Sequence, residues 1–312
     1  MDSSETIQKV NILEKNIQKV IKGKKEVIRD VIVAFLSGGH VLIEDVPGVG
    51  KTTLAQALAK STNLSYSRIQ FTSDLLPSDI LGVSIFDQNK SEFKFNPGPI
   101  FSCIVVADEI NRATPKTQSA LLQAMSEAKV TVDGRTFNLI KPFIVIATQN
   151  PFEYKGTFPL PENQLDRFAI RISIGYPDYQ SEKVIITNIN PYNSSDDLSP
   201  VVSKDDILYL QSLVVKVNID ESILEYILNI VNKTRDNSLF DLGVSPRGTI
   251  ALKLAAQANA IVEGRNYCIP DDVKNMAVAV LAHRVIMKSE VSKVSTEEEA
   301  IMEVLENIKV PH

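Results

Sequence analysis

The residues with the clearest capacity for chemistry lie in "EDVPGVGKTT", at positions 44–53. Gly48 and Gly50 permit the backbone turns through which successive amides form an anion-binding concavity at a helix start. Lys51 adds a cation for the β- and γ-phosphates of a nucleotide, and Thr52 adds a hydroxyl for Mg²⁺. The predicted nucleotide-binding residues are Pro47, Gly48, Val49, Gly50, Lys51, Thr52 and Thr53.

Asp45 occupies the position at which the usual phosphate-loop pattern has its first glycine. The amides that hold phosphate come from later in the loop, so this residue only has to leave the preceding strand. An acidic side chain turned toward the phosphates would repel them. Asp45 is therefore compatible with a nucleotide-binding loop if its side chain points away from the phosphates. The alternative interpretation is a solvated glycine-rich turn with a surface lysine.

A second candidate group is the acid pair in "IVVADEINRA", at positions 104–113. An apolar run delivers Asp108 and Glu109 to the carboxyl end of a predicted strand, where ligands of parallel sheets bind. Asp108 suits coordination of Mg²⁺, and Glu109 suits activation of the attacking water. Asn150, in "ATQNP", ends the next apolar run and can hold that water without adding charge. Taken singly, these residues also fit a charged loop start and a turn.

Short runs rich in Val and Ile recur between residues 40 and 174, and several are apolar on both faces. That pattern is typical of parallel strands covered by helices on both sides. The sequence therefore predicts an α/β sandwich with a five-stranded parallel sheet. The predicted strands are "HVLIED" (40–45), "YSRIQF" (66–71), "CIVVAD" (103–108), "PFIVIATQ" (142–149) and "AIRISI" (169–174).

Beyond the sheet the sequence pattern becomes helical. Ser203 and Ser245 are predicted helix caps, and a proline follows Ser245 at the first helical position. We predict an α/β nucleotide-binding domain at 1–175, a linker at 176–202 and a small all-helical domain with a C-terminal segment at 203–312. The linker is rich in Asn, Ser, Asp and Pro after a short helix around residues 182–188.

Composition narrows the functional class. The apolar stretches are far shorter than the roughly 20 residues of a membrane helix, and the polar start lacks a signal peptide, so we expect a cytoplasmic chain without membrane insertion. Two cysteines and three scattered histidines give no zinc-ligand spacing. The net charge of −5 has the wrong sign for a nucleic-acid surface, so we expect no nucleic-acid partner.

These motifs, in this order, resemble the MoxR family of AAA+ ATPases, in the helix-2-insert class. The matching stretches are "HVLIEDVPGVGKTTLAQALA", "ADEINRATPKTQSALLQAMSEAKVTVDG", "FIVIATQNPFEYKGTFPLPENQLDRF" and "SPRGTIALKLAAQANA". The family's loop often has aspartate at the position of Asp45. The resemblance implies a P-loop αβα domain with an all-α lid, and ATP and Mg²⁺ as cofactors. It implies Walker A, Walker B and sensor 1 roles for Lys51, Thr52, Asp108, Glu109 and Asn150.

The resemblance also implies roles for residues outside these motifs. Arg167 resembles an arginine finger that reaches a neighbouring subunit's γ-phosphate, and Arg247 resembles sensor 2. Gly23 resembles the segment that lines an adenine pocket, and Arg112 resembles a second interface arginine. Each residue also has a structural interpretation. Arg167 could form a surface ion pair, and Arg247 could be a surface side chain at a helix start. Gly23 could be a loop glycine, and Arg112 could cap a helix.

Two stretches, 79–100 and 129–139, have hairpin-like alternation and resemble the inserts of this class. In such motors the inserts project toward a central pore. Phe86, Phe93 and Phe95 are candidates for client contact, although packing within the insert explains most of them.

The family resemblance implies self-association into a hexameric ring that remodels or matures a client protein. A client with a von Willebrand factor A domain is implied in the same way. The alternatives are a magnesium-chelatase-like or MCM-like motor acting on a metal-insertion enzyme or DNA, and an ATP-bound scaffold with little turnover.

Overall fold

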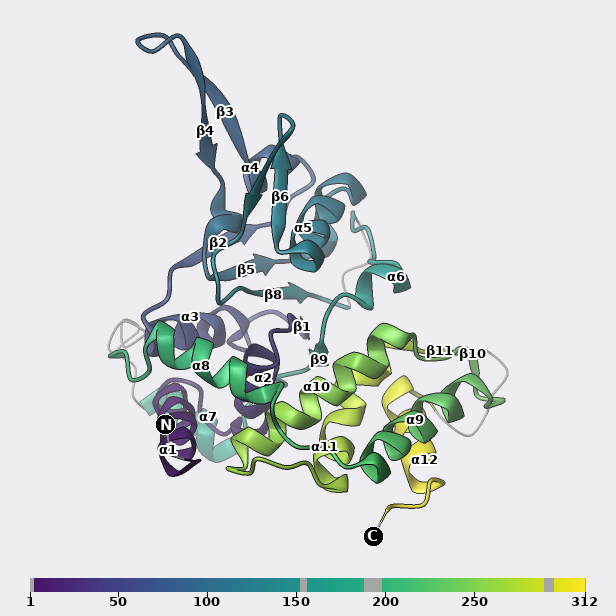
Figure 1. Ribbon diagram of the computed structural model, residues 1–312. Coiled ribbons are helices and arrows are strands. Elements are labelled where there is room, and N and C mark those ends of the chain that lie inside the picture. Colours follow the sequence, from purple (N-terminus) through teal and green to yellow (C-terminus); the bar gives the residue numbers. More distant parts are fainter. Residues whose placement is uncertain (1–2, 152–155, 188–197, 289–294, 312) are drawn as a thin grey trace.

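A computed structural model describes residues 3–151, 156–187, 198–288 and 295–311. Its centre is a five-stranded parallel sheet, which confirms the predicted α/β class (Figure 1). The strand order is β2 (Tyr66–Gln70), β5 (Ile104–Asp108), β8 (Ile144–Gln149), β1 (Val41–Glu44) and β9 (Ile170–Ile172). All five predicted strands are present. Because all five run the same way, their carboxyl ends meet at one edge of the sheet.

The sheet is buried on both faces, which explains its continuous apolar strands. Val41 and Ile43 of β1 belong to a core shared with helices on one side, whereas Leu42 belongs to a second core on the other side. The first layer contains α1 (Ser3–Gln18), α2 (Lys25–Leu36) and α3 (Lys51–Thr62). The second layer contains α4 (Pro77–Leu81) and α5 (Pro115–Glu127).

Two antiparallel hairpins extend from the second layer, as the sequence predicts. β3 (Gly82–Asp87) pairs with β4 (Glu92–Pro97), and β6 (Lys129–Val132) pairs with β7 (Arg135–Asn138). Figure 1 shows the β3–β4 hairpin projecting from one end of the molecule. Phe95 stacks on Phe137 of the other hairpin with 4.2 Å between ring centroids, which joins the two hairpins.

The phenylalanines of the β3–β4 hairpin divide between packing and exposure. Phe95 lies between the hairpins, whereas Phe86 and Phe93 contact each other and remain exposed near the tip. The sequence predicts packing for most of these rings. The structure confirms it for Phe95, but the prediction is wrong for Phe86 and Phe93, which lie near the exposed tip of the hairpin and contact each other.

The C-terminal part is helical, with α8 (Lys204–Val214), α9 (Glu221–Arg235), α10 (Pro246–Val262), α11 (Pro270–Leu281) and α12 (Glu297–Glu306). Ser203 and Ser245 cap α8 and α10 as predicted, because each hydroxyl accepts a hydrogen bond from an amide of the first turn. This part also holds a ribbon of β10 (Phe240–Leu242) and β11 (Ile286–Met287), which are too short to give a periodic signal. α10 packs against α2, so the helical part lies against the first layer.

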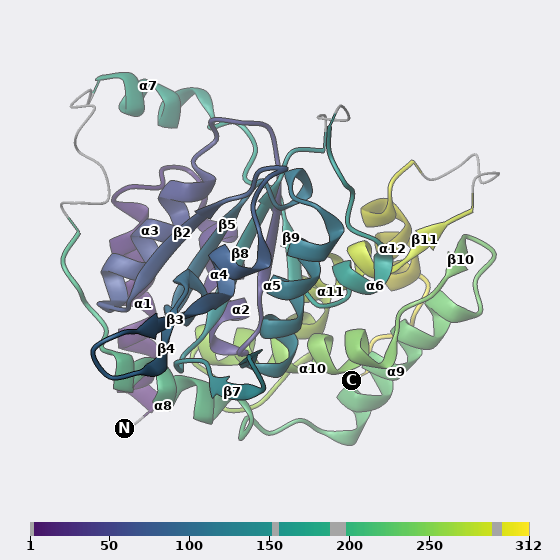
Figure 2. The same cartoon turned by 90° about the horizontal axis from the view of Figure 1, so that it is seen from above.

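Short elements complete the chain: η1 (Pro99–Phe101), η2 (Ile110–Arg112), α6 (Glu162–Leu165), α7 (Tyr179–Thr187) and η4 (Ala282–Arg284). Figure 2 shows α7, the short helix predicted at the start of the linker, at the rim of the molecule. Residues 188–197 of the predicted linker lie outside the described residues. Across the described helices, none is both long and apolar enough to cross a bilayer.

Candidate functional site

The predicted phosphate loop connects the end of β1 to the start of α3. Gly48 and Gly50 have φ angles of 88° and 95°, a region that a residue with a Cβ rarely adopts. Val49 packs against the core, and Lys51 is the first residue of α3. The loop therefore has the strand-to-helix setting that an anion site at a helix start requires.

Asp45 is turned away from this loop. Its Oδ2 accepts hydrogen bonds from Ser173 Oγ at 3.0 Å, from the Ile174 amide at 2.7 Å and from the Gly175 amide at 2.6 Å. Burial alone would raise the pKa of this carboxyl, but these hydrogen bonds and one from the Val46 amide lower it below its usual value. The carboxylate therefore joins the ends of β1 and β9.

The loop meets the first acid of the second motif. Thr52 Oγ1 donates to Asp108, at 3.1 Å to Oδ2 and 3.4 Å to Oδ1. Asp108 is buried, and its Oδ1 also accepts from Thr148 Oγ1 at 3.2 Å. Residues 56 positions apart in the sequence thus meet at the carboxyl edge of the sheet.

Lys51 lies beside the same acids. Its Nζ donates to the backbone carbonyl of Asp45 at 2.6 Å. Burial lowers the pKa of the Lys51 ammonium. The carboxylates of Asp45, Asp108 and Glu109 act in the opposite direction on that pKa, which places all three within electrostatic range of the ammonium.

Glu109 is held from several sides. It has a left-handed backbone with φ of 58°, and its amide donates to Thr148 Oγ1 at 3.0 Å. Its Oε2 accepts from Gln70 Nε2 at 2.8 Å and lies 3.3 Å from Arg112 Nε. Non-glycine residues in this conformation are often found at functional sites, where surrounding contacts hold them.

Asn150 follows β8, the strand next to β5, and therefore lies at the same edge as Glu109. The structure thus brings together the loop, Thr52, the two acids and Asn150 at one edge of the sheet.

Gly23 belongs to the segment between α1 and α2, and its φ of 69° lies in the left-handed region that favours glycine. A Cβ at this position would lie 2.3 Å from Ser181 Oγ of α7. Two residues earlier, Ile21 Cδ1 lies 4.0 Å from the position of a Cβ on Gly50. The Gly23 segment is therefore adjacent to the phosphate loop.

The turn that carries Arg167 lies beside the start of α10, which carries Arg247. Arg167 Nη1 donates to the Leu122 carbonyl at 2.8 Å and to Ser126 Oγ at 2.9 Å. Ser245 Oγ, two residues before Arg247, donates to Asp166 at 3.0 Å.

Arg167 lies away from the phosphate loop. The Ala169 amide donates to the His40 carbonyl at 2.8 Å, so residues just before β9 lie at the amino end of β1. From His40 to Asp45 a strand spans roughly 16 Å at about 3.3 Å per residue. Arg167 therefore lies near the edge of the sheet opposite to the loop.

Three further residues contact the acids and were not predicted from the sequence: Arg68, Gln70 and Thr148. Arg68 Nε donates to Asp108 Oδ2 at 2.6 Å, and Gln70 contacts Glu109 as described. The available signal was the alternation of "YSRIQF", which puts Arg68 and Gln70 on one face of β2 next to its carboxyl end.

The donors fit the magnesium ion of a bound nucleotide. Mg²⁺ usually binds one or two protein oxygens and completes its shell with water and phosphate oxygens. The Thr52 hydroxyl and the Asp108 carboxylate are such oxygens, in contact with each other next to a phosphate loop. A nucleotide-independent site would need more protein ligands, and no cluster of three or more His, Cys, Asp or Glu residues suited to a metal occurs among the described residues.

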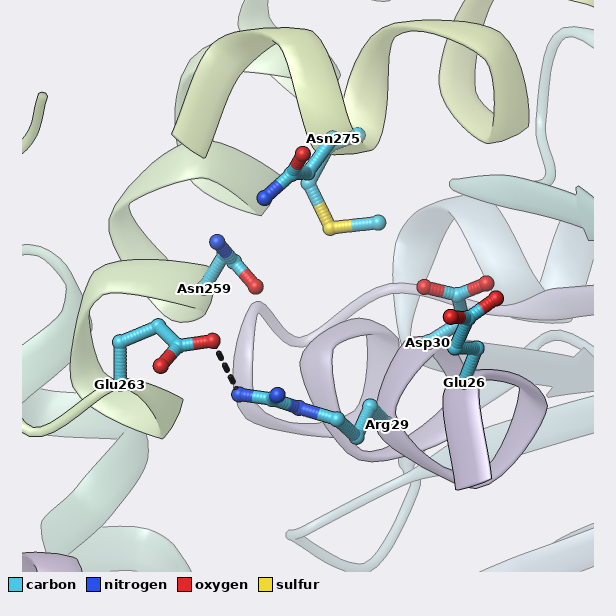
Figure 3. Close-up of a pocket in the computed structure, with 7 residues that line it drawn as sticks. Glu26, Arg29, Asp30, Asn259, Glu263 and Asn275 are labelled. Carbon is cyan, nitrogen blue, oxygen red and sulfur yellow. Dashed lines mark hydrogen bonds and ion pairs between the residues drawn. The ribbon is translucent and has the colours of Figure 1, made fainter. Parts of the chain in front are cut away.

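A separate cleft of about 340 Å³ lies between α2 and the helices α10 and α11 (Figure 3). Glu26 and Asp30 of α2 face Asn259 and Asn275 across it, and Arg29 bridges it through an ion pair with Glu263. None of the described residues that line the cleft belongs to the phosphate loop, although Glu26 and Asp30 also line a second pocket that reaches Asp45.

The motifs and the fold agree with the comparisons to known proteins. Residues 40–170 match the model of the ATPase family associated with various cellular activities (AAA), and residues 232–304 match the AAA lid domain. Over 280 residues the chain is 39% identical to Chaperone MoxR1 of Mycobacterium tuberculosis, covering 87% of this chain and 74% of that protein. The chain belongs to the MoxR family of AAA+ ATPases.

Two other comparisons extend over nearly the whole chain. The protein YeaC of Bacillus subtilis is 50% identical over 297 residues, which cover 95% of this chain and 93% of YeaC. A solved structure from Cytophaga hutchinsonii has a TM-score of 0.91 and 37% identity, and covers 99% of this chain and 97% of that one. The fold of this MoxR-family chain, with its AAA sheet and lid helices, is therefore shared from end to end with the Cytophaga hutchinsonii structure.

Proposed function

We propose that this MoxR-family chain is a Mg²⁺-dependent ATPase that works in a ring and remodels or matures another protein. The observation that carries the proposal is the hydrogen bond between Thr52 Oγ1 and Asp108. It joins the hydroxyl of the phosphate loop, which follows β1, to the acid at the end of β5, two strands away in the sheet, as the metal of a bound nucleotide requires. Lys51 and Glu109 lie at the same edge of the sheet.

Each residue has a defined task in this proposal. The amides of 48–53 bind the phosphates of ATP, and Lys51 exchanges the Asp45 carbonyl for the β- and γ-phosphates. Thr52 and Asp108 hold Mg²⁺, which supplies charge neutralisation to the phosphates. Glu109 accepts a proton from the attacking water, and Asn150 orients that water. The products are ADP and phosphate.

Assembly into a ring completes the site. Charge that develops on the γ-phosphoryl group needs a further cation, and an arginine finger is worth roughly 10³ to 10⁵ in rate. The location of Arg167 near the opposite edge of the sheet supports its action on the nucleotide of a neighbouring subunit. We propose the same for Arg247, in a hexameric ring.

The proposed client is another protein. The name of the relative Chaperone MoxR1 supports this class of activity. A von Willebrand factor A domain is the client class that we propose. A motor of the magnesium-chelatase or MCM type would instead act on a metal-insertion enzyme or DNA, and the net charge of −5 argues against DNA.

Two variants test the proposal. Lys51→Ala should lose most of its affinity for ATP. Glu109→Gln should bind ATP with unchanged affinity and lose about 10²-fold or more of its turnover, the usual contribution of a general base. Turnover equal to that of the unmodified chain in Glu109→Gln would contradict the role of Glu109. ATP binding with no measurable turnover in the unmodified chain would favour the scaffold instead. A Glu109→Gln chain loaded with ATP is also the form to use for capturing the client.

A further inference from the structure

Arg68 contacts the buried acid of the site from the neighbouring strand. β2 pairs with β5 so that Arg68 lies opposite Val106, two residues before Asp108. From there Arg68 Nε donates to Asp108 Oδ2 at 2.6 Å. The Asp108 side chain is only 7% exposed, whereas that of Arg68 is 50% exposed. The carboxylate is therefore fixed in the interior, and the guanidinium has room to leave.

The oxygen that Arg68 contacts is also the one that Thr52 contacts most closely. Asp108 Oδ2 accepts from Thr52 Oγ1 at 3.1 Å and from Arg68 Nε at 2.6 Å. Thr148 contacts the other oxygen, Oδ1, at 3.2 Å. The guanidinium thus supplies positive charge at the carboxylate oxygen that also contacts Thr52, and Thr52 and Asp108 are the residues to which Mg²⁺ is assigned.

When no metal is present, the positive charge of Arg68 offsets the negative charge of the Asp108 carboxylate. A buried carboxylate without a cation nearby is costly, and a charge-assisted hydrogen bond from arginine offsets that cost. Mg²⁺ needs the same oxygen and brings two positive charges, so the guanidinium and the metal repel each other there. Occupation by one therefore disfavours occupation by the other.

We propose that Arg68 competes with Mg²⁺ for Asp108 and so sets the Mg²⁺ concentration at which nucleotide binds tightly. This inference rests on the proposed function, since it assumes that the loop binds ATP with Mg²⁺. Arg68 holds Asp108 in the nucleotide-free chain and releases it when the metal arrives. Its long, half-exposed side chain permits this movement without a change in the core.

The competition predicts that removing the Arg68 charge changes nucleotide affinity in opposite directions with and without Mg²⁺. Replacing Arg68 by glutamine removes the competitor, so less Mg²⁺ should suffice. It also removes a positive charge next to the phosphates, so nucleotide without metal should bind more weakly. Simple damage to the site would weaken binding under both conditions.

The experiment titrates a fluorescent, non-hydrolysable ATP analogue into the full chain in EDTA and at a series of MgCl₂ concentrations. Arg68→Gln should lower the Mg²⁺ concentration for half-maximal affinity by about tenfold, the size of one hydrogen bond to a charged group. In EDTA the same variant should bind the analogue several-fold more weakly. Arg68→Lys keeps the charge and should lie close to the unmodified chain.

Two further variants complete the design. Arg135→Gln removes the same charge from an exposed position on β7 and should change neither titration. Arg68→Met keeps the aliphatic stem and serves as a second neutral variant, should Arg68→Gln fail to fold.

The outcomes separate the two proposals. An unchanged Mg²⁺ requirement in the neutral Arg68 variants, or weaker binding in both EDTA and Mg²⁺, would overturn the competition while leaving the ATPase proposal intact. Absence of binding by the unmodified chain at saturating Mg²⁺ would overturn the proposed function and this inference with it.

Discussion

Arg284 donates from Nε to Oδ1 of Asp166 at 2.9 Å and so joins the helical part of the chain to the turn that carries Arg167. The Arg284 side chain is 1% exposed, and that of Asp166 is 18% exposed. Burial lowers the pKa of the guanidinium to about 10, and the Asp166 carboxylate acts against that shift. This is a desolvated ion pair, so losing one partner leaves the other charge uncompensated.

The first prediction concerns this ion pair. Asp166→Ala should lower the free energy of unfolding by about 3 kcal/mol, because it leaves the Arg284 charge buried without its carboxylate. The matched control is Glu263→Ala, which breaks the Arg29–Glu263 pair, whose side chains are 24% and 42% exposed. Glu263→Ala should lower the free energy of unfolding by no more than about 1 kcal/mol. Urea unfolding measures both, and equal losses would contradict the special position of the buried pair.

The predictable part of the molecule is the part whose signal is local. A stretch of a few residues is enough to recognise each of these features: the apolar runs of the five strands, the serine caps at 203 and 245, and the loop of 44–53. The meeting of Thr52 with Asp108 is also predictable, because the loop after β1 and the end of β5 lie at the same edge of a parallel sheet.

What the sequence did not predict depends on contacts between distant segments. Arg68 and Gln70 lie in an ordinary-looking strand, and only the pairing of β2 with β5 brings them to the two acids. The hydrogen bonds of Asp166 with Ser245 and Arg284 join positions 79 and 118 residues apart. No local pattern encodes such pairs.

The second prediction tests whether Arg167 acts across subunits. A chain with Arg167→Ala keeps its own loop but lacks the proposed finger, and a chain with Lys51→Ala lacks the loop but keeps the finger. Each alone should lose most ATPase activity, the first by about 10³-fold or more. Mixing them should restore part of the activity, because mixed rings contain interfaces with both intact residues. Absence of rescue at every mixing ratio would contradict action in trans.

The third prediction concerns acid stability and His40. The ring is buried, with Nδ1 accepting from the Val145 amide at 3.0 Å and Nε2 lying 3.1 Å from the Met125 carbonyl. Burial lowers the pKa of His40 from 6.5 to about 4. Between these values the unfolded chain binds a proton that the folded chain does not, so stability falls as pH decreases. The corresponding loss is about 3 kcal/mol from pH 6.5 to pH 4.

His40→Asn should make the dependence of stability on pH shallower in that range, at the cost of lower stability at pH 7.5. Urea unfolding at pH 7.5, 6 and 5 measures the slope. His283 is also buried with a lowered pKa, so it should keep part of the slope in the variant. If His40→Asn leaves the slope unchanged, the pKa of His40 is the same in the folded and the unfolded chain.

The last prediction has the opposite sign and concerns Asp30, in the cleft between α2 and the helical part (Figure 3). Burial, with the nearby Glu26 carboxylate, raises the pKa of Asp30 to about 7, although Arg29 acts against the shift. The folded chain therefore holds a proton that the unfolded chain releases above pH 3.8, and the stability contributed by Asp30 is lost as pH rises toward 7.

Asparagine mimics the protonated acid at every pH. Asp30→Asn should therefore raise Tm at pH 8 by on the order of 3 °C, with a smaller gain at pH 5. Thermal unfolding at the two pH values, with Asp271→Asn on the exposed start of α11 as the control, measures the difference. An equal gain at both pH values would mean that the Asp30 carboxyl is ionised in the folded chain throughout this range.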